Sequence, residues 1–159
     1  VAATRSADIP LVSGTNFSDW FNPLEGTLVI TAEEHTLSKS VVTISDGTSL
    51  ERILRLTSSG AIPQVQITDT TTQFASVIGS PLTALTRIKS AFAYKQDDCI
   101  FAVNGTLGTL DTAATLPTVD RMYIGASATG AVQLQNYIQR VTYFNTRLTD
   151  VQVQALSTP

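Results

Sequence analysis

Short runs in which apolar and more polar residues alternate recur along the chain, and turn-forming residues separate them. In residues 26–32, Leu28 and Ile30 alternate with the residues between them, and this period of two predicts a β-strand with one buried face. Comparable runs predict strands at residues 10–12, 40–45, 50–57, 62–68, 72–78, 87–95, 99–104, 121–126 and 133–145. The chain is therefore expected to be built almost entirely of β-strands.

Glycine-containing turns join several of these predicted strands into hairpins. Asp46-Gly47 separates one pair of strands, and Asn104-Gly105 follows the strand at residues 99–104. Asn-Gly is the strongest of these signals because both central residues of a type I′ turn need positive φ. Ser58-Ser59-Gly60 marks a further turn. Turn residues recur about every 8 to 12 positions, which is typical of an all-β sandwich.

Two of the predicted strands have further features. The strand at residues 87–95 alternates regularly and is expected near the centre of the sandwich. In residues 133–145 the apolar positions mix a step of three with a step of two, which predicts a bulge near Gln139 or Arg140. The alternative is that Arg140 points inward and is paired.

The C-terminal segment departs from the β pattern. In residues 149–156, Val153 and Leu156 stand three positions apart, and Thr149 or Asp150 precedes them as a candidate N-cap. This pattern predicts one short helix of about two turns that closes the sandwich.

The length of 159 residues suits a single domain. Residues 1–9 mix small and polar side chains without a period, so we expect a linker from a larger parent chain. Residues 10–159 are then predicted to form one β-sandwich domain.

Composition and charge exclude two classes of partner. Charged residues make up 14% of the chain, the net charge is −3, and no run of Lys or Arg forms a basic stripe. Nucleic acid is therefore not an expected partner, because phosphate contacts from Lys and Arg dominate that kind of binding. No apolar run approaches the roughly 20 residues of a membrane-spanning helix, so we expect no membrane insertion.

Cys99 is the only cysteine, so neither an internal disulfide nor a cysteine-based zinc site can form. Ile100 and Phe101 follow it in an apolar strand, and an inert, buried thiol is predicted. The absence of a disulfide favours assembly in a reducing cytoplasm.

Candidates for metal or catalytic chemistry are weak. Residues 33–35 (Glu-Glu-His) and 97–98 (Asp-Asp) are acidic clusters, but neither has the spacing of a calcium loop, so no cofactor is predicted and calcium is the alternative. A catalytic triad would have to use His35, the sole histidine. The carboxylates open to a glycosidase mechanism are Asp46, Asp97, Asp98 and Asp111, and no local motif pairs them. We therefore expect no enzyme activity.

Trp20 is the main candidate for a carbohydrate-binding residue. Its ring can stack on the apolar face of a sugar, while Asp19 and Asn22 can bond sugar hydroxyls. Asp97 and Tyr123 complete the predicted carbohydrate-binding set. The alternative is that Trp20 seals the edge of the sandwich.

Eight segments, taken in order, resemble a known family. They are TRSAD, WFNPLEGTLVI, ISDGT, AFAYKQDD, FAVNG, LPTVDRMYIG, YIQRVTYFNTRL and TDVQVQAL. Together they resemble the concanavalin A-like, laminin G-like domains at the ends of bacteriophage tail fibres, tailspikes and related virion proteins. The resemblance implies a jelly-roll of two antiparallel sheets and frequent trimerisation of the parent protein. The shared residues, which look like framework positions, are Trp20, Asn22, Glu25, Tyr94, Asn104, Gly105, Gly125 and Arg147.

The resemblance also sets the functional expectation. It implies a non-enzymatic recognition domain of a phage tail fibre or tailspike that binds a bacterial surface polysaccharide or receptor. The protein would then belong to the virion and be assembled in the cytoplasm of the bacterial host. The alternative is a structural domain that trimerises or caps a virion fibre. A polysaccharide depolymerase is a third hypothesis, since jelly-rolls also host such enzymes.

Overall fold

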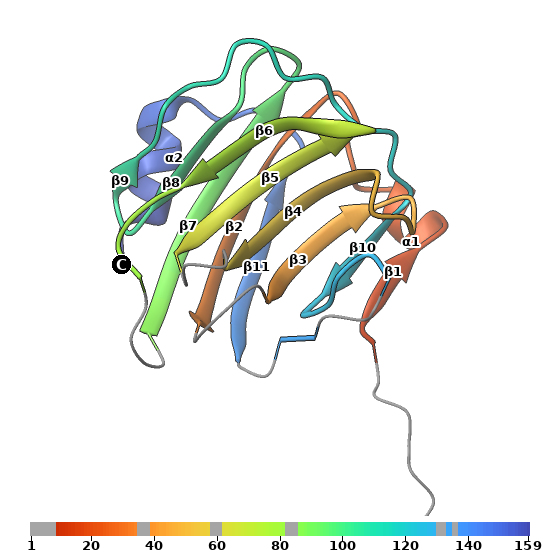
Figure 1. The fold of residues 1–159 in the computed structure, drawn as a ribbon, viewed down its shortest axis with the longest axis horizontal. Coiled ribbons are helices and arrows are strands. Elements are labelled where there is room, and N and C mark those ends of the chain that lie inside the picture. The colour runs from red at the N-terminus through yellow and green to blue at the C-terminus, as the bar shows by residue number, and fades with distance from the viewer. Residues whose placement is uncertain (1–8, 35–38, 58–61, 82–85, 130–132, 135–136) are drawn as a thin grey trace, which may run out of the picture.

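The computed structural model describes residues 9–34, 39–57, 62–81, 86–129, 133–134 and 137–159, which form a sandwich of two antiparallel sheets (Figure 1). The six-stranded sheet has the order β1 (Leu11–Ser13), β10 (Arg121–Ile124), β3 (Ser40–Ser45), β4 (Glu51–Thr57), β5 (Pro63–Asp69), β6 (Thr71–Val77). The five-stranded sheet has the order β11 (Ile138–Phe144), β2 (Glu25–Glu34), β7 (Thr86–Lys95), β8 (Ile100–Val103), β9 (Thr106–Leu107). The predicted all-β jelly-roll sandwich is confirmed.

The main hydrophobic core fills the space between the two sheets. Because successive residues of a strand face opposite sides, β4 and β5 turn Ile53 and Ile67 inward, and β2 and β7 turn Ile30 and Phe92 toward them. Phe74 of β6 stacks on Phe92 with the ring centroids 5.8 Å apart. β7 lies in the middle of its sheet, as its regular alternation predicted.

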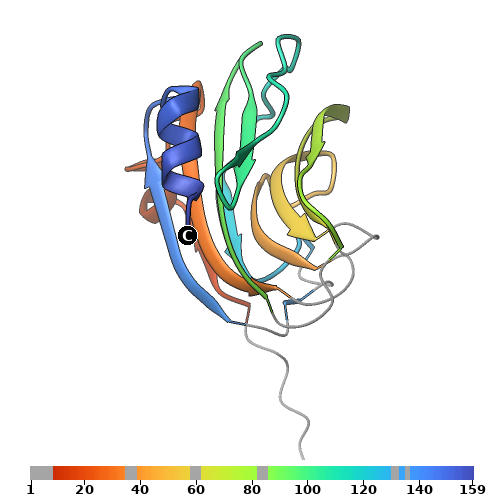
Figure 2. The same cartoon turned by 90° about the vertical axis from the view of Figure 1, so that its left-hand side faces the viewer.

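A helix covers the outer face of the five-stranded sheet. α2 (Asp150–Ser157) is capped by Thr149, whose hydroxyl accepts from the Gln152 N–H while the Gln152 side chain accepts from the Thr149 N–H. Val153 is fully buried against the sheet. Figure 2 shows α2, in dark blue, on the side of β2 (orange) that faces away from the six-stranded sheet. The predicted C-terminal helix and its Thr149 cap are confirmed.

β2 is buried on both faces, whereas the alternation in residues 26–32 predicted only one buried face. Val29 packs beneath α2, and Thr27 is also fully buried. The Thr27 hydroxyl accepts a hydrogen bond of 2.9 Å from the Leu148 N–H, so the segment before α2 covers it. The second face is buried by the C-terminal segment, which the local pattern of β2 does not encode.

β11 is shorter than the strand predicted at residues 133–145. It begins at Ile138, and Gln133 forms only an isolated bridge with Ala126. The register with β2 shifts between Ile138 and Arg140, which confirms the predicted bulge. The Arg140 side chain is exposed, so the alternative of an inward, paired Arg140 is wrong.

The predicted glycine turns have the expected backbone geometry. Asn104 and Gly105 have φ of 46° and 79°, as a type I′ turn requires, and they join β8 to β9. Gly47 has φ of 96° in the turn between β3 and β4. These residues fix the hairpin registers and thereby the order of side chains across each sheet.

One further helix was not predicted. α1 (Thr15–Ser18) is a single turn with one buried side chain, Phe17, and is too short to produce a helical period. Neither described helix has the length and apolar character to span a bilayer. Residues 1–8 of the predicted linker, His35 and the predicted turn at residues 58–60 lie outside the described residues.

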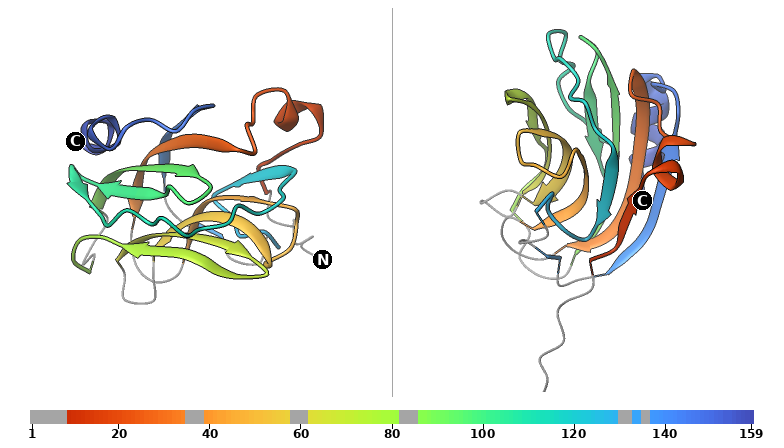
Figure 3. Two further views of the ribbon diagram at one scale, coloured as in Figure 1. Left: turned by 90° about the horizontal axis from the view of Figure 1, so that it is seen from above. Right: turned by 90° about the vertical axis from the view of Figure 1, so that its right-hand side faces the viewer.

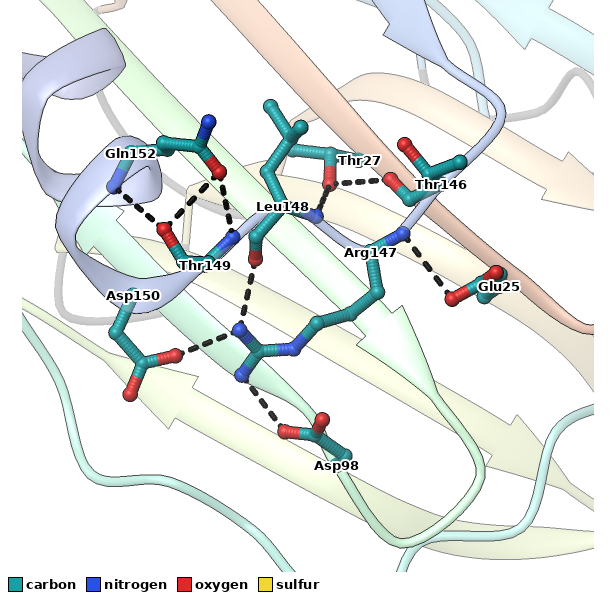
Figure 4. A network of polar contacts seen from close by, with 9 residues as sticks. All are labelled: Glu25, Thr27, Asp98, Thr146, Arg147, Leu148, Thr149, Asp150 and Gln152. Carbon is teal, nitrogen blue, oxygen red and sulfur yellow. Dashed lines mark hydrogen bonds and ion pairs between the residues drawn. The ribbon is translucent and has the colours of Figure 1, made fainter.

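A network of polar contacts around Arg147 fixes the segment between β11 and α2 (Figure 4). The side chain is 10% exposed, and its guanidinium forms ion pairs of 2.7 Å with Asp98 and with Asp150. It also donates to the Leu148 carbonyl at 2.7 Å, and the Arg147 backbone N–H donates to the Glu25 carboxylate at 3.3 Å. The β7–β8 turn, the start of β2 and α2 are therefore joined through one residue.

Candidate functional site

The outer face of the six-stranded sheet carries a row of polar side chains. Strand register places six of them opposite one another across the sheet, and we call them the polar row: Ser13, Arg121, Ser45, Arg52, Thr68 and Thr72. The intervening residues Met122, Ile44 and Ile53 face the core, so the polar row faces outward. Within the described part of the chain, no helix lies over this sheet (Figure 1).

Arg52, on β4, has a guanidinium that is only partly satisfied. Its Nη1 donates to the Ser49 carbonyl and its Nη2 to the Gln66 Oε1 at 3.4 Å. The buried Nε, and the buried Oγ1 of Thr68 opposite it, have no hydrogen-bond partner in the described protein. Burial lowers the pKa of Arg52. Buried polar atoms without partners are unfavourable, so Arg52 and Thr68 hold their positions in the polar row at an energetic cost.

Arg121, on β10, stands on the other side of Ser45. The Asp120 carboxylate accepts from its Nε at 2.7 Å and from its Nη2 at 3.0 Å. The hydrogen bonds that Arg121 donates to Asp120 and Tyr123 raise the pKa of Arg121, and the pairing with Arg121 lowers the pKa of Asp120. The Arg121 guanidinium also packs against Gly47, where a Cβ would lie 3.1 Å from Nη1. The turn after β3 thus holds this side chain in place.

The two arginines form a pair with a hydroxyl between them. Neighbouring strands are about 4.8 Å apart, so the backbones of Arg121 and Arg52, two strands apart, are separated by about 10 Å. Both side chains are half-exposed, while Ser45 and Thr68 form a buried hydroxyl floor. Guanidinium groups bind carboxylates in a bidentate manner, and hydroxyls bond sugar hydroxyls. The face therefore has the chemistry for an anionic or hydroxyl-rich ligand.

The predicted carbohydrate-binding residues near α1 form an aromatic cluster. The half-buried Trp20 ring lies 5.1 Å from the Phe17 ring and 5.0 Å from the Tyr143 ring, and its Nε1 donates to the Asn16 carbonyl at 2.6 Å. Asp19 beside it is exposed. One edge of the Trp20 ring is therefore occupied by packing inside the protein.

Asn22 joins the same cluster through its polar groups. Its N–H donates to the Tyr143 hydroxyl at 2.9 Å, and its carbonyl accepts from the Tyr94 hydroxyl at 3.0 Å. Its side chain donates to the Asn145 carbonyl at 2.8 Å and accepts from the Leu24 N–H at 3.0 Å. This fits the framework role that the resemblance implied for Asn22.

The remaining predicted residues lie elsewhere. Asp97 is exposed in the turn between β7 and β8, where its backbone has φ of 57°. Tyr123 follows Arg121 by two residues on β10, so it belongs to the same face of the sheet as the polar row, and its side chain is buried. The structure thus groups Asp19, Trp20 and Asn22 and separates Tyr123 from them. The binding role of these five residues stays a prediction.

Most of the acidic residues that were candidates for metal binding or catalysis stabilise turns or form ion pairs. Asp46 accepts from the Thr48 N–H at 2.8 Å, Asp111 accepts from the Ala113 N–H at 2.9 Å, and Asp98 pairs with Arg147. The described residues contain no group of three or more His, Cys, Asp or Glu side chains arranged to hold a metal.

Solved structures share this sandwich. The CBM40 domain of the Ruminococcus gnavus IT-sialidase, solved with alpha2,3 sialyllactose, superposes with a TM-score of 0.71 at 13% identity and covers 87% of this chain and 84% of its own. The NanB sialidase from Streptococcus pneumoniae gives a TM-score of 0.73 at 15% identity over 94% of this chain, which spans only 27% of the enzyme. No protein-family model and no curated protein matches this chain.

At these identities the likeness is one of fold. It confirms the sandwich of two antiparallel sheets that the resemblance implied. The carbohydrate-binding modules among these structures match this chain over most of both lengths. The origin in a phage tail stays a prediction.

Proposed function

We propose that this domain is a non-catalytic glycan-binding module that holds its ligand on the polar row of the six-stranded sheet. The observation that carries the proposal is the pair Arg52 and Arg121 on either side of Ser45, with the Arg52 Nε and Thr68 Oγ1 free of protein partners. A ligand that bridges the two guanidinium groups would pair with Arg52 and share Arg121 with Asp120.

The ligand we propose is an acidic glycan. A carboxylate on a sugar matches a guanidinium pair, and the exposed Ser13 and Thr72 hydroxyls and the Gln66 amide suit sugar hydroxyls. The sandwich resembles modules of the Ruminococcus gnavus sialidase that were solved with alpha2,3 and with alpha2,6 sialyllactose. Both of these ligands contain a carboxylated sugar. Single sites of this shallow kind bind weakly and gain strength from several copies.

Calorimetric titration with α2,3-sialyllactose and with acidic bacterial polysaccharides tests this function. Arg52→Ala and Arg121→Ala should each weaken binding tenfold or more, since a hydrogen bond to a charged group contributes about 1.5–3 kcal/mol. Lys95→Ala removes one positive charge from the other sheet and is the control. It should bind with the affinity of the unsubstituted protein. Binding that is absent for all these glycans, or ligand-induced amide shifts at the polar row that survive the loss of both arginines, would exclude the polar row.

The aromatic cluster is kept as a second contact region because the sequence predicted it. Trp20→Phe preserves an aromatic ring against Phe17 and Tyr143 but shortens the exposed edge. If Trp20, Asp19 and Asn22 contact the glycan, this variant lowers affinity while the melting temperature stays close to that of the parent. An unchanged affinity assigns Trp20 to packing.

The parent protein is proposed to be a phage tail fibre or tailspike, located in the virion, that carries this module to a bacterial surface polysaccharide. The eight sequence segments support this assignment, and a homotrimeric parent would supply three copies of the site. The domain, labelled with a fluorescent dye, should stain encapsulated cells of a phage host. The staining should disappear when the capsule is removed. Equal labelling of bare cells would contradict the proposal.

The alternative is a structural domain that trimerises or caps a fibre. Val151 on α2 and Leu24 before β2 are apolar and strongly exposed, which a partner surface could cover. Sedimentation of the protein at high concentration decides between the two. A monomer under these conditions removes the structural function, whereas a stable trimer with no glycan affinity supports it.

A further inference from the structure

A groove lies on the face of the molecule opposite the polar row. The outer face of the five-stranded sheet has a groove of about 490 Å³ beside the end of α2. Viewed from above, α2 and β6 lie on opposite sides of the sandwich (Figure 3, left), so the groove and the polar row face away from each other. We call this feature the cationic groove; its cationic side chains are Arg87, Lys89 and Arg140.

Strand register places two of these cations on either side of a hydroxyl. Thr31 of β2 is opposite Arg140 of β11 on one side and opposite Lys89 of β7 on the other. Hydrogen bonds hold both cations at the groove walls: Arg140 Nε donates to the Thr142 hydroxyl at 3.0 Å, and Lys89 Nζ donates to the Thr158 carbonyl at 2.8 Å. The row Arg140, Thr31, Lys89 repeats the cation–hydroxyl–cation order of the polar row.

The groove is positive in a protein that is negative as a whole. None of its described lining residues is Asp or Glu, although Glu33 of β2 lies opposite Arg87 and offsets part of that charge. Lys89 and Arg140 then give the groove a local excess of positive charge, whereas the net charge of the chain is −3. Such a site concentrates anions.

Part of the groove lining is apolar. Val29, Phe144 and Leu156 line the groove together with the cations, and Asn104 and Gln139 add amide groups. Aromatic and aliphatic side chains suit the apolar face of a sugar ring, and the amides suit its hydroxyls. A small anion alone would leave the apolar side chains unused.

We propose that the cationic groove is a second glycan site, which binds an anionic sugar unit through Arg140 and Lys89 with the ring placed over Val29 and Phe144. The anionic group is a carboxylate or a phosphate. The site is independent of the polar row, so a polyanionic chain can be held on either face of the domain or crosslink two domains.

Amide chemical-shift titration of the whole chain tests the proposal with three probes: tetragalacturonate for a carboxylate, poly(glycerol phosphate) for a phosphate, and neutral maltotetraose. Shifts centred on Thr31, Asn104 and Leu156 are expected with an anionic probe and not with maltotetraose. Shifts with the first probe alone or with the second alone identify which anion the groove accepts, and shifts with both support the shared chemistry.

Substitutions separate this site from diffuse attraction and from the polar row. Arg140→Gln and Lys89→Gln should each lower the affinity measured at the groove tenfold or more, and Lys95→Gln, on the same face of β7 but outside the groove, should leave it within twofold. The double variant Arg52→Ala with Arg121→Ala should leave the groove shifts intact, even if the polar row binds nothing.

The proposal is overturned if neither anionic probe shifts the groove amides or if maltotetraose shifts them equally. It is also overturned if Lys95→Gln weakens binding as much as Arg140→Gln, because that result shows attraction to overall charge only. If a variant folds poorly, the amide shifts of the unsubstituted protein alone show whether the groove binds the anionic probes.

Discussion

At the scale of single residues, Cys99 has a protected thiol. Its side chain is fully buried and its Sγ donates to the Lys95 carbonyl at 3.3 Å. Burial raises the pKa of Cys99 to about 11, so the native thiol should resist a thiol reagent at pH 8 and react only on unfolding. Timed labelling with and without denaturant checks this, and native labelling as fast as for a free cysteine would contradict it.

The raised pKa of Cys99 also predicts that the folded protein becomes less stable at alkaline pH. In the unfolded chain the thiol of Cys99 loses its proton near its ordinary pKa, whereas the folded protein keeps it protonated up to about pH 11. Burial also raises the pKa of Tyr94, which acts in the same direction at higher pH. Melting temperature should therefore fall as the pH rises from about 9 toward 11. A melting temperature that rises over this interval would contradict the prediction.

Arg147 is the side chain whose loss should be most disruptive among the charged residues. It is 10% exposed and pairs with Asp98 and Asp150, so Arg147→Ala leaves two carboxylates without their partner. We expect the free energy of unfolding to fall by roughly 2 kcal/mol, less than for a fully buried pair because both partners are partly exposed. Urea denaturation measures this free energy, and Arg140→Ala, at an exposed position, is the control. Equal stability of the two variants would show that the contacts of Arg147 do not stabilise the fold.

At the scale of elements, α2 stabilises the fold through one face. Val153 is fully buried against the five-stranded sheet, while Val151 on the same helix is 76% exposed. Val153→Ala should lower the free energy of unfolding by about 2 kcal/mol, from two lost methyl groups and a cavity. Val151→Ala, the same chemical change, should alter it by less than about 0.5 kcal/mol. Urea denaturation of both variants checks the difference, and similar losses would contradict the packing of α2.

The sequence predicts elements well where the signal is local. Alternation located the strands, Asp46-Gly47 and Asn104-Gly105 located hairpin turns, and Thr149 located the start of α2. Prediction failed where the cause is distant or the element is too short. The second buried face of β2 depends on α2, and α1 is a single turn around Phe17.

At the scale of the whole molecule, the candidate site depends on strand order. Hairpin pairing of β3 with β4 brings Ser45 beside Arg52 and can be inferred from the Asp46-Gly47 turn. Pairing of β10 with β3 brings Arg121 to the same row, and it joins segments that are far apart in the chain. Trp20 was the main candidate in the sequence because a tryptophan ring can stack on a sugar, yet one edge of its ring packs on Phe17. Residue type alone therefore did not locate the polar row.

The central claim is that glycan binds on the outer face of the six-stranded sheet. Amide chemical-shift mapping with α2,3-sialyllactose or an acidic bacterial polysaccharide tests it most directly. We expect shifts centred on Ser45, Arg52, Thr68 and Arg121, which are lost in Arg52→Ala and kept in Lys95→Ala. Shifts confined to the loop around Trp20, or no shifts with any acidic glycan at millimolar concentration, would contradict it.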